Sequence, residues 1–428
     1  MINLYYDKII DGVPAPNGTK DIALTKDARQ IPYVKDYTIF HPISVMNTFY
    51  FIVKANKVVV NLYTEKQKAK NLFYPIELAD QIFNWDRDWG NLISKRAKRM
   101  IQKNHMKLLI LAPKLKENHY TMIRLNARIN ELIATGISPE SVVLVIGEIK
   151  GVYKNVFSIE NVYGIDYQQI YTQMLYKTRW GMSKLDWIFG HDTRAKTLSS
   201  KDIEKEYFDI DNWNPTKTFN FLSSSKDHDI ALILEILYKN ISSFGNINFK
   251  LEDYNIKELN NNYIDPRKSS IEKNSKIDLL KNLKSFNNTD ELTTSLINVV
   301  CDDYFLNVDT AYKPELNGLA PGFNVWSQIA TGQPFMVIGC LDTMKYLNNE
   351  KYFSYNEILE QTYDSITVPT KRVELIVKNL ERLGYMEKDK INKLIQEAKP
   401  FMKANRQRFF EKKMAIKLMN LFVDMKYE

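Results

Sequence analysis

A polar loop at residues 223–228 (SSSKDH) holds the first side chains that could do chemistry. It follows a short apolar stretch and precedes a predicted helix, and the N–H groups and dipole at such a helix start favour a bound diphosphate. The hydroxyls of Ser224 and Ser225 and the ammonium group of Lys226 could add to that binding. The alternative is an ordinary helix N-cap by Ser225 or Asp227 beside an incidental lysine.

Two further polar groups fall where strands are expected to end or helices to begin. Asp302 and Asp303 follow an apolar stretch, where a carboxylate could bind the hydroxyl pair of a ribose; a solvated turn is the alternative. Asn324 and Gln328 lie one helical turn apart and could contact sugar or nucleotide hydroxyls. A capping or surface role explains these two amides equally well.

A general base must lie within hydrogen-bond reach of the hydroxyl that it activates. Glu148, directly after the apolar stretch SVVLVIG, is one candidate. His191 and Asp192, in the polar loop FGHDTR, are the other, with an exposed loop as the alternative. Five scattered histidines form no pattern typical of a metal site, so we expect none.

A basic segment at residues 91–105 (NLISKRAKRMIQKNH) has the periodicity of a helix. Its basic residues are spaced so that several share one face, and they are Lys95, Arg96, Lys98, Arg99 and Lys103. This pattern is typical either of a solvated helix surface or of contact with phosphates or nucleic acid.

The elements that would position these residues begin with a βαβ unit at residues 107–147. Apolar runs at residues 107–112 (KLLILA) and 141–147 (SVVLVIG) predict buried strands, and the residues between them predict an amphipathic helix ending at Gly136. Continuous apolar strands joined by such a helix indicate a parallel sheet covered on both faces. Upstream, residues 57–63 predict a strand and residues 76–85 a short helix.

The same pattern returns about a hundred residues later. Residues 218–222 predict a strand, residues 230–241 a helix ending at Gly245, and residues 247–249 another strand. His119 and His228 each lie 17 residues before the glycine of their unit. Further on, residues 323–331 predict a helix, residues 334–340 a strand, and residues 370–383 and 388–425 helices. Two matched units suggest two Rossmann-like domains.

These elements divide the chain at the polar stretch DIDNWNP, residues 209–215. We expect an N-terminal domain at residues 1–212, a second domain at residues 213–390, and a terminal helix at residues 391–428 packing across the seam.

Composition excludes several classes of protein. With 428 residues, 44% hydrophobic and 26% charged, the chain can fold around a sizeable core and is not a disordered one. Cys301 and Cys340 are too few for a disulfide framework and favour a reducing cytoplasm. No run of about 18 apolar residues predicts a membrane span. The formal charge of +8 hints only weakly at a polyanionic partner.

Residues 333–380 resemble the C-terminal region of glycosyltransferase-like proteins frequent in bacteriophages and bacteria. The shared motifs are a Pro-Phe strand ending in Gly, a Lys-Tyr-Leu triplet, a Tyr-Asp pair and a helix-opening Arg. The matching residues are Pro334, Phe335, Gly339, Lys345, Tyr346, Leu347, Tyr363, Asp364 and Arg372. The loop with Lys226 and His228 is similar to a basic loop that opens their second domain. Where relatives carry Thr-Glu-Lys, this chain has Gly322, Phe323 and Asn324.

The resemblance implies an α/β fold of the GT-B type, with two Rossmann-like domains whose parallel sheets face a cleft. It implies a nucleotide-sugar donor, most simply a UDP-sugar, bound in the second domain, and an acceptor bound by the N-terminal domain. The side chains expected to hold this donor are Ser224, Ser225, Lys226, His228, Asp302, Asp303, Asn324 and Gln328. Lys226 and helix N-termini would stabilise the leaving diphosphate without a metal ion.

The basic helix favours double-stranded DNA as the acceptor, with the sugar added to a hydroxymethylated pyrimidine in phage DNA within the host cytoplasm. Such a base would be flipped out of the duplex, and Trp180 or Trp187 could stack on it, although core positions explain both tryptophans as well. Two alternatives remain. One is the same chemistry on a surface polysaccharide, lipid-linked glycan or protein; the other is a non-catalytic nucleic-acid-binding protein on a degenerate scaffold.

Overall fold

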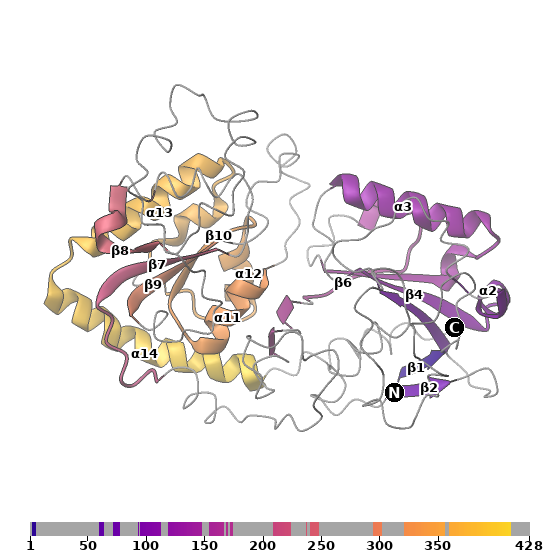
Figure 1. The fold of residues 1–428 in the computed structure, drawn as a ribbon, viewed down its shortest axis with the longest axis horizontal. Coiled ribbons are helices and arrows are strands. Elements are labelled where there is room, and N and C mark those ends of the chain that lie inside the picture. The colour runs from indigo at the N-terminus through magenta and orange to yellow at the C-terminus, as the bar shows by residue number, and fades with distance from the viewer. Residues whose placement is uncertain are drawn as a thin grey trace, which may run out of the picture.

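The computed structural model describes thirteen separate parts of the chain and two single residues. They are residues 2–5, 60–63, 72–77, 93, 95–112, 119–147, 154–166, 168–169, 172–173, 209–223, 237, 240–247, 294–301, 321–355 and 359–411. Within them the protein is an α/β protein with two parallel sheets and covering helices (Figure 1), a layout compatible with two Rossmann-like halves.

The first sheet has six strands in the order β2-β1-β3-β4-β5-β6, and every neighbouring pair is parallel. The strands are β1 (Ile2–Tyr5), β2 (Val60–Tyr63), β3 (Leu72–Glu77), β4 (Met106–Ala112), β5 (Val142–Ile146) and β6 (Val162–Gly164). Helix α2 (Lys95–Gln102) leads into β4, and α3 (His119–Ala134) connects β4 to β5. The βαβ unit predicted at residues 107–147 is confirmed.

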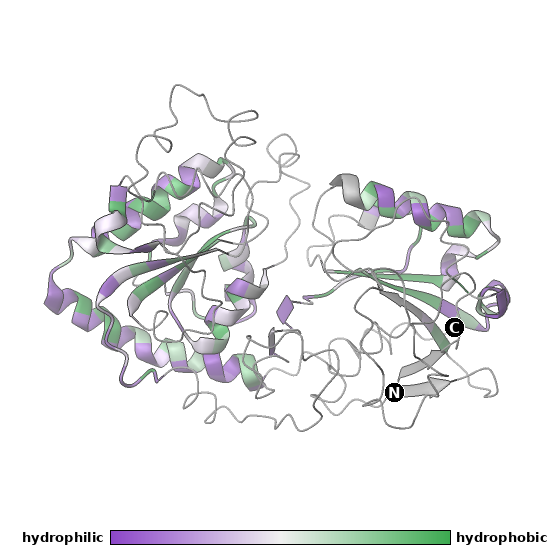
Figure 2. Ribbon diagram, in the orientation of Figure 1, coloured by the Kyte–Doolittle hydropathy of each residue, from purple (hydrophilic) through white to green (hydrophobic). Residues whose placement is uncertain are grey.

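Both faces of this sheet are covered, as the continuous apolar strands predict. Leu108 and Ile110 belong to the same core cluster as Ala97 and Ile101 of α2 and the apolar face of α3. Leu109 alternates with them on β4, points to the opposite face, and is also fully buried. Figure 2 shows hydrophobic residues along β4 and β5, with polar and apolar residues alternating along α3.

The helix predicted at residues 76–85 is wrong at its start. Ile76 and Glu77 are the last residues of β3, where they pair with Ile110 and Leu111 of β4. The preceding apolar residues 72–74 are buried, so pairing with the central strand β4 overrides the helical spacing. The strand predicted at residues 57–63 is confirmed over β2.

The second sheet has four parallel strands in the order β10-β9-β7-β8. The strands are β7 (Lys217–Ser223), β8 (Gly245–Ile247), β9 (Ser295–Cys301) and β10 (Phe335–Ile338). Four helices accompany it: α11 (Phe323–Thr331), α12 (Thr343–Asn349), α13 (Pro369–Gly384) and α14 (Lys388–Glu411). The strands and helices predicted at residues 218–222, 323–331, 334–340 and 370–383 are confirmed in place.

The two sheets share one topology. In each sheet, the strand that comes second in the chain lies on one side of the strand that comes first, while the third and fourth strands lie on the other side. The order therefore reverses between the first and third strands of each sheet. In open α/β sheets, ligands bind beyond the carboxyl ends of the strands at such a reversal. The reversals here lie between β1 and β3 and between β7 and β9.

The two glycines that matched in the sequence do different things. Gly136 has a φ of 91° after α3, which is the left-handed conformation typical of a helix end. Gly245 follows a short 3-10 helix, Ser242–Phe244, so a helical segment ends at it as its spacing predicts; it also begins β8, in extended rather than left-handed conformation. A Cβ atom there would lie 2.4 Å from the ring of Phe219, its register partner on β7. Close strand packing therefore requires this glycine.

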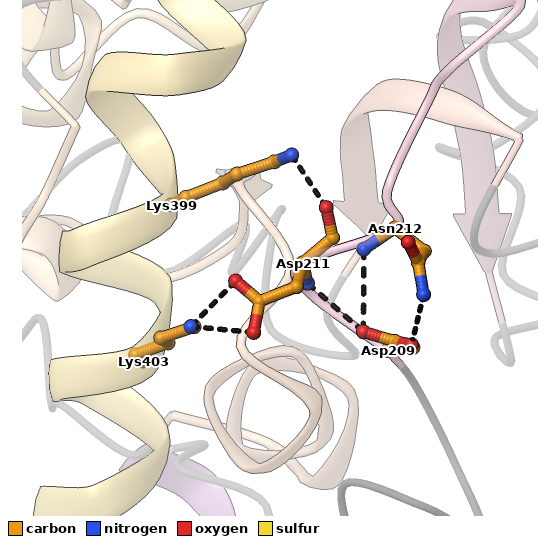
Figure 3. Close-up of polar contacts among 5 residues, drawn as sticks. All are labelled: Asp209, Asp211, Asn212, Lys399 and Lys403. Atoms are coloured by element: carbon orange, nitrogen blue, oxygen red, sulfur yellow. Dashed lines mark hydrogen bonds and ion pairs between the residues drawn. The ribbon is translucent and has the colours of Figure 1, made fainter.

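The stretch predicted as the seam packs on the second sheet. Ile210 and Trp213 are buried in the core cluster of that sheet. Asp209 accepts hydrogen bonds from the backbone N–H groups of Asp211 and Asn212, which closes a turn (Figure 3). Lys403 of α14 pairs with the Asp211 carboxylate at 2.6 Å.

Helix α14 belongs to the same half of the molecule. Ile395, Ala398, Met402 and Phe409 are buried in the core cluster of the second sheet, and α14 packs against α11. Residues 412–428 of the predicted terminal helix lie outside the described residues. None of the described helices is long and apolar enough to span a membrane.

Candidate functional site

Most of the side chains predicted to bind or react lie outside the described residues, and so do Trp180 and Trp187. They are the base candidates Glu148, His191 and Asp192, and the donor-side residues Ser224, Ser225, Lys226, His228, Asp302 and Asp303. The structure nevertheless describes the strands and helices that flank the donor-side residues in the chain.

The carboxyl ends of β7 and β9 lie side by side at the reversal of the second sheet. Their last residues, Ser223 and Cys301, are register partners. The chain continues from Ser223 into Ser224 and from Cys301 into Asp302. Two segments singled out in the sequence for their polar side chains therefore leave the sheet from adjacent strands.

Helix α11 begins at the same edge. The side-chain amide of Asn324 donates a hydrogen bond to the backbone oxygen of Cys301 at 3.4 Å, which holds the first turn of α11 against the end of β9. The N-cap residue of α11 is Gly322, and the first turn of this helix contains no acidic residue. The dipole at a helix start favours an anion.

Gln328 lies deeper, at the end of a buried row of amides. Its Oε1 accepts a hydrogen bond from Nδ2 of Asn298 at 2.7 Å, and it is 1% exposed. Asn298 is the register partner of Asn220, which in turn is the register partner of Asn246. This amide row, defined by Asn246, Asn220, Asn298 and Gln328, crosses three strands inside the core. Asn324 and Gln328 are thus buried side chains and lie neither in a cap nor at the surface.

Tyr363, Asp364 and Arg372, three of the motif residues singled out in the sequence, are buried around β10. The hydroxyl of Tyr363 accepts a hydrogen bond from the N–H of Val337 on β10. Asp364 accepts hydrogen bonds from the N–H groups of Met344 and Lys345, the second and third residues of α12. Arg372 donates to the backbone oxygen of Gly339. These contacts fix how the chain turns from the carboxyl end of β10 into α12.

Burial governs the electrostatics of these residues. It raises the pKa of Asp364, although the N–H groups of α12 and the nearby Arg372 act in the opposite direction. It lowers the pKa of Arg372, against the attraction of Asp364. A carboxylate and a guanidinium that are both buried each stabilise the charge of the other.

Asp166 joins the two halves of the molecule. It lies just beyond β6 and accepts hydrogen bonds from Nε1 of Trp326 at 3.0 Å and from the hydroxyl of Tyr346 at 3.1 Å. Burial, reinforced by Asp166, raises the pKa of Tyr346, so that hydroxyl stays protonated and can donate. Three residues later, Nε2 of Gln169 donates to the hydroxyl of Tyr352 at 2.8 Å.

These contacts turn the carboxyl edges of the two sheets towards one another. Asp166 directly follows the carboxyl end of β6 in the first sheet. Its partners are Trp326, in the first turn of α11 beside the end of β9, and Tyr346, in the helix that follows β10. Both partners therefore lie near the carboxyl edge of the second sheet, and Figure 1 shows α12 on the side of that sheet that faces the first one.

Sequence reasoning missed Asp166 and the amide row. A carboxylate directly after a short strand was a signal for Asp166, but its partners lie 160 and 180 residues further along the chain. For the amide row, the signal was an Asn inside each of the apolar stretches TFNFL and SLINVV.

The basic residues of α2 lie elsewhere, at the amino end of β4. Lys95, Arg96, Arg99 and Lys103 are exposed and Lys98 is half-buried, while Ala97 and Ile101 face the core. The helix spans residues 95–102, shorter than the predicted 91–105, because Asn104 takes a left-handed φ of 57°. Lys103 lies in the turn after the helix.

Among the described residues, no three His, Cys, Asp or Glu side chains gather closely enough to hold a metal ion. In comparisons with known proteins, no family model, curated protein or solved structure matches this chain.

Proposed function

We propose that this protein is a glycosyltransferase of the GT-B type, which moves a sugar from a nucleotide-sugar donor to a hydroxymethylated pyrimidine in DNA. The observation that carries the donor half of the proposal is the pairing of Ser223 with Cys301. It brings the ends of β7 and β9 together where the strand order reverses, which is where α/β sheets bind nucleotides.

In the proposed reaction, the second sheet binds the donor. Lys226, with the hydroxyls of Ser224 and Ser225, would hold the diphosphate, aided by the dipole at the start of α11. Asp302 or Asp303 would bind the ribose hydroxyls. His228 would add a further contact in the same loop.

The first half would present the acceptor. Glu148, or His191 with Asp192, would take the proton from the acceptor hydroxyl as its oxygen attacks the anomeric carbon. The bond from that carbon to the diphosphate breaks, and Lys226 with helix N-termini would stabilise the departing negative charge. The facing carboxyl edges support this arrangement, because donor and acceptor could meet between them.

Mass spectrometry tests the reaction. The protein is incubated with DNA containing 5-hydroxymethylcytosine and each of several UDP- and GDP-sugars, and the nucleosides are then analysed. We expect the modified nucleoside to gain the mass of one sugar with one donor. No gain with any donor would overturn DNA as the acceptor. Slow hydrolysis of a donor without DNA would then indicate transfer to a glycan, lipid or protein, and absence of hydrolysis would indicate a non-catalytic protein.

The donor site is tested separately by Lys226→Ala. Loss of a charged hydrogen bond to a diphosphate costs about 1.5–3 kcal/mol, so the Kd for UDP measured by calorimetry should rise about 10- to 100-fold. The matched control is Lys217→Ala, which removes an exposed lysine from the opposite end of β7. Equal UDP affinity in the two variants would exclude Lys226 from the donor site.

A further inference from the structure

Helix α2 and the turn that follows it carry a row of exposed positive charge, Lys95, Arg99 and Lys103, called here the α2 row. Lys95, Arg99 and Lys103 are exposed and recur every four residues, so they rise along about 12 Å of one side of the helix and its final turn. Figure 2 shows α2 as strongly hydrophilic. Within the part of the chain that the structure describes, none of these three forms an ion pair with a carboxylate.

The net positive charge of the whole chain comes from the segment that contains α2. The chain has no Asp or Glu from Trp89 to Lys116. The eight basic residues between them are Lys95, Arg96, Lys98, Arg99, Lys103, Lys107, Lys114 and Lys116. Their number equals the formal net charge of +8. The rest of the chain therefore has equal numbers of basic and acidic side chains. A strong local excess on a balanced molecule is typical of a surface that binds a polyanion.

The α2 row lies far from the edge where the two halves meet. Residues 103–105 lead from α2 directly into β4, so the end of α2 lies at the amino end of the first sheet. Asp166 and its partners lie at the carboxyl edge. A strand of seven residues, such as β4, is about 23 Å long. Figure 1 shows α2 on the side of the first sheet turned away from the second sheet.

We propose that the α2 row is an anchoring surface for the phosphate backbone of duplex DNA, separate from the site of sugar transfer. Duplex DNA carries one charge per about 1.7 Å of its axis, so a linear row of about 12 Å meets several phosphates. The contacts are to the backbone alone and therefore independent of sequence.

An anionic membrane fits the row less well. A helix that lies on a membrane buries an apolar face in the lipid boundary. The apolar residues of α2 pack instead on the core of the first half, where Ala97 and Ile101 are buried and Met100 is partly buried. The large hydrophobic side chains that are exposed in the described part of the chain are Ile123, Phe353, Val368 and Tyr385, and none of them is on α2.

The proposal rests on the proposed function only for the choice of DNA as the acceptor. The anchoring contacts would hold the duplex about 20 Å from the reacting base, a distance set by the length of the strands between the two edges. DNA affinity and donor chemistry would then respond to different substitutions.

The test measures DNA affinity against salt for the full chain carrying Lys95→Ala, Arg99→Ala and Lys103→Ala together. Fluorescence anisotropy with a labelled, mixed-sequence duplex gives Kd between about 50 and 200 mM salt. Each lost phosphate contact should lower the slope of log Kd against log salt by about 0.9, or about 2.7 for three. Across that range, the wild-type protein should therefore lose about 40-fold more affinity than the variant.

The matched control replaces three exposed lysines of α14, Lys388, Lys390 and Lys393, by alanine. It removes the same charge from a surface where Glu387 and Glu397 pair with two of these lysines. The control should keep the wild-type slope. Equal slopes for the wild-type protein and the α2 variant would overturn the anchoring surface, as would wild-type binding to vesicles rich in anionic lipid but not to DNA.

The two proposals can fail separately. DNA binding that weakens in the α2 variant, with no sugar transfer by any protein, would support the anchor and overturn the transferase. Sugar transfer by the wild-type protein, with an unaltered salt slope in the α2 variant, would support the transferase and overturn the anchoring surface.

Discussion

At the scale of single residues, Asp166 has the greatest effect on how the molecule is assembled. It accepts hydrogen bonds from side chains of two different helices of the second half and from the N–H of Gln169 in its own segment. A buried acceptor shared by several donors is costly to remove, because each donor is left without a partner. Its partners come from sequence positions that no local pattern connects with it.

Asp166→Ala should lower the free energy of unfolding by about 2–4 kcal/mol, because Trp326 and Tyr346 would each keep a buried donor without an acceptor. Tyr346→Phe should cost about 1.5 kcal/mol, since it removes one hydrogen bond to a charged group. Urea unfolding followed by tryptophan fluorescence measures both values.

A double-mutant cycle distinguishes this role from a general loss of packing. In the Asp166→Ala background, Tyr346→Phe should cost much less than it does alone, because the acceptor is already gone. Additive costs would contradict the hydrogen bond between the two side chains.

At the same scale, the sequence picked out some residues correctly but not their roles. Tyr363, Asp364 and Arg372 were noticed as parts of a motif, and each makes a specific buried hydrogen bond around β10. Asn324 and Gln328 were noticed for their spacing, which cannot tell a buried face from an exposed one. Their helix packs against β9, and that packing alone turns both amides into the core.

At the scale of elements, the strands could be predicted because a strand buried on both faces is apolar along most of its length. Residues 107–112 and 141–147 fit this pattern without ambiguity. Ile76 and Glu77 were ambiguous, because an apolar residue followed by a glutamate is found both at the end of a strand and at the start of a helix. The order of the strands could not be predicted, since it depends on contacts between distant segments.

Two glycines that end helices allow the cost of backbone strain to be compared with and without a steric clash. Gly332 after α11 and Gly136 after α3 both have positive φ, at 81° and 91°. A Cβ atom on Gly332 would lie 2.9 Å from the backbone oxygen of Met402, whereas on Gly136 it would meet only the flexible end of Gln102. We therefore expect the first substitution to cost more.

Gly136→Ala should destabilise the protein by about 1 kcal/mol from the left-handed conformation alone. Gly332→Ala should cost at least about 2 kcal/mol, because α14 must also move away. Chemical denaturation of the two variants gives the comparison. Equal costs would mean that α14 adjusts freely against α11.

At the scale of the whole molecule, the described hydrophobic residues form two separate core clusters, one for each sheet. The polar bonds of Asp166 and Gln169 join the two halves. Halves with independent hydrophobic cores behave as separate cooperative units. The sequence predicted two units from its repeated pattern, but not the carboxylate that joins them.

Scanning calorimetry should therefore resolve two unfolding transitions. Leu125→Ala, in the first core, and Met402→Ala, in the second, should each cost about 2–5 kcal/mol. Each substitution should lower the Tm of its own transition by roughly 5–15 °C and leave the other nearly unchanged. A single transition that both substitutions shift would show that the halves unfold together.

The amide row of the second sheet has a consequence for how its strands find their partners. Asn246, Asn220 and Asn298 stand in register, and on β7 they alternate with Phe219 and Phe221, which face the opposite side. Sliding any of these strands by one residue would turn its amide towards the aromatic side and leave neighbouring amides without partners. The amide row therefore specifies the register of β7, β8 and β9, because the hydrogen bonds between the amides form only in the observed alignment.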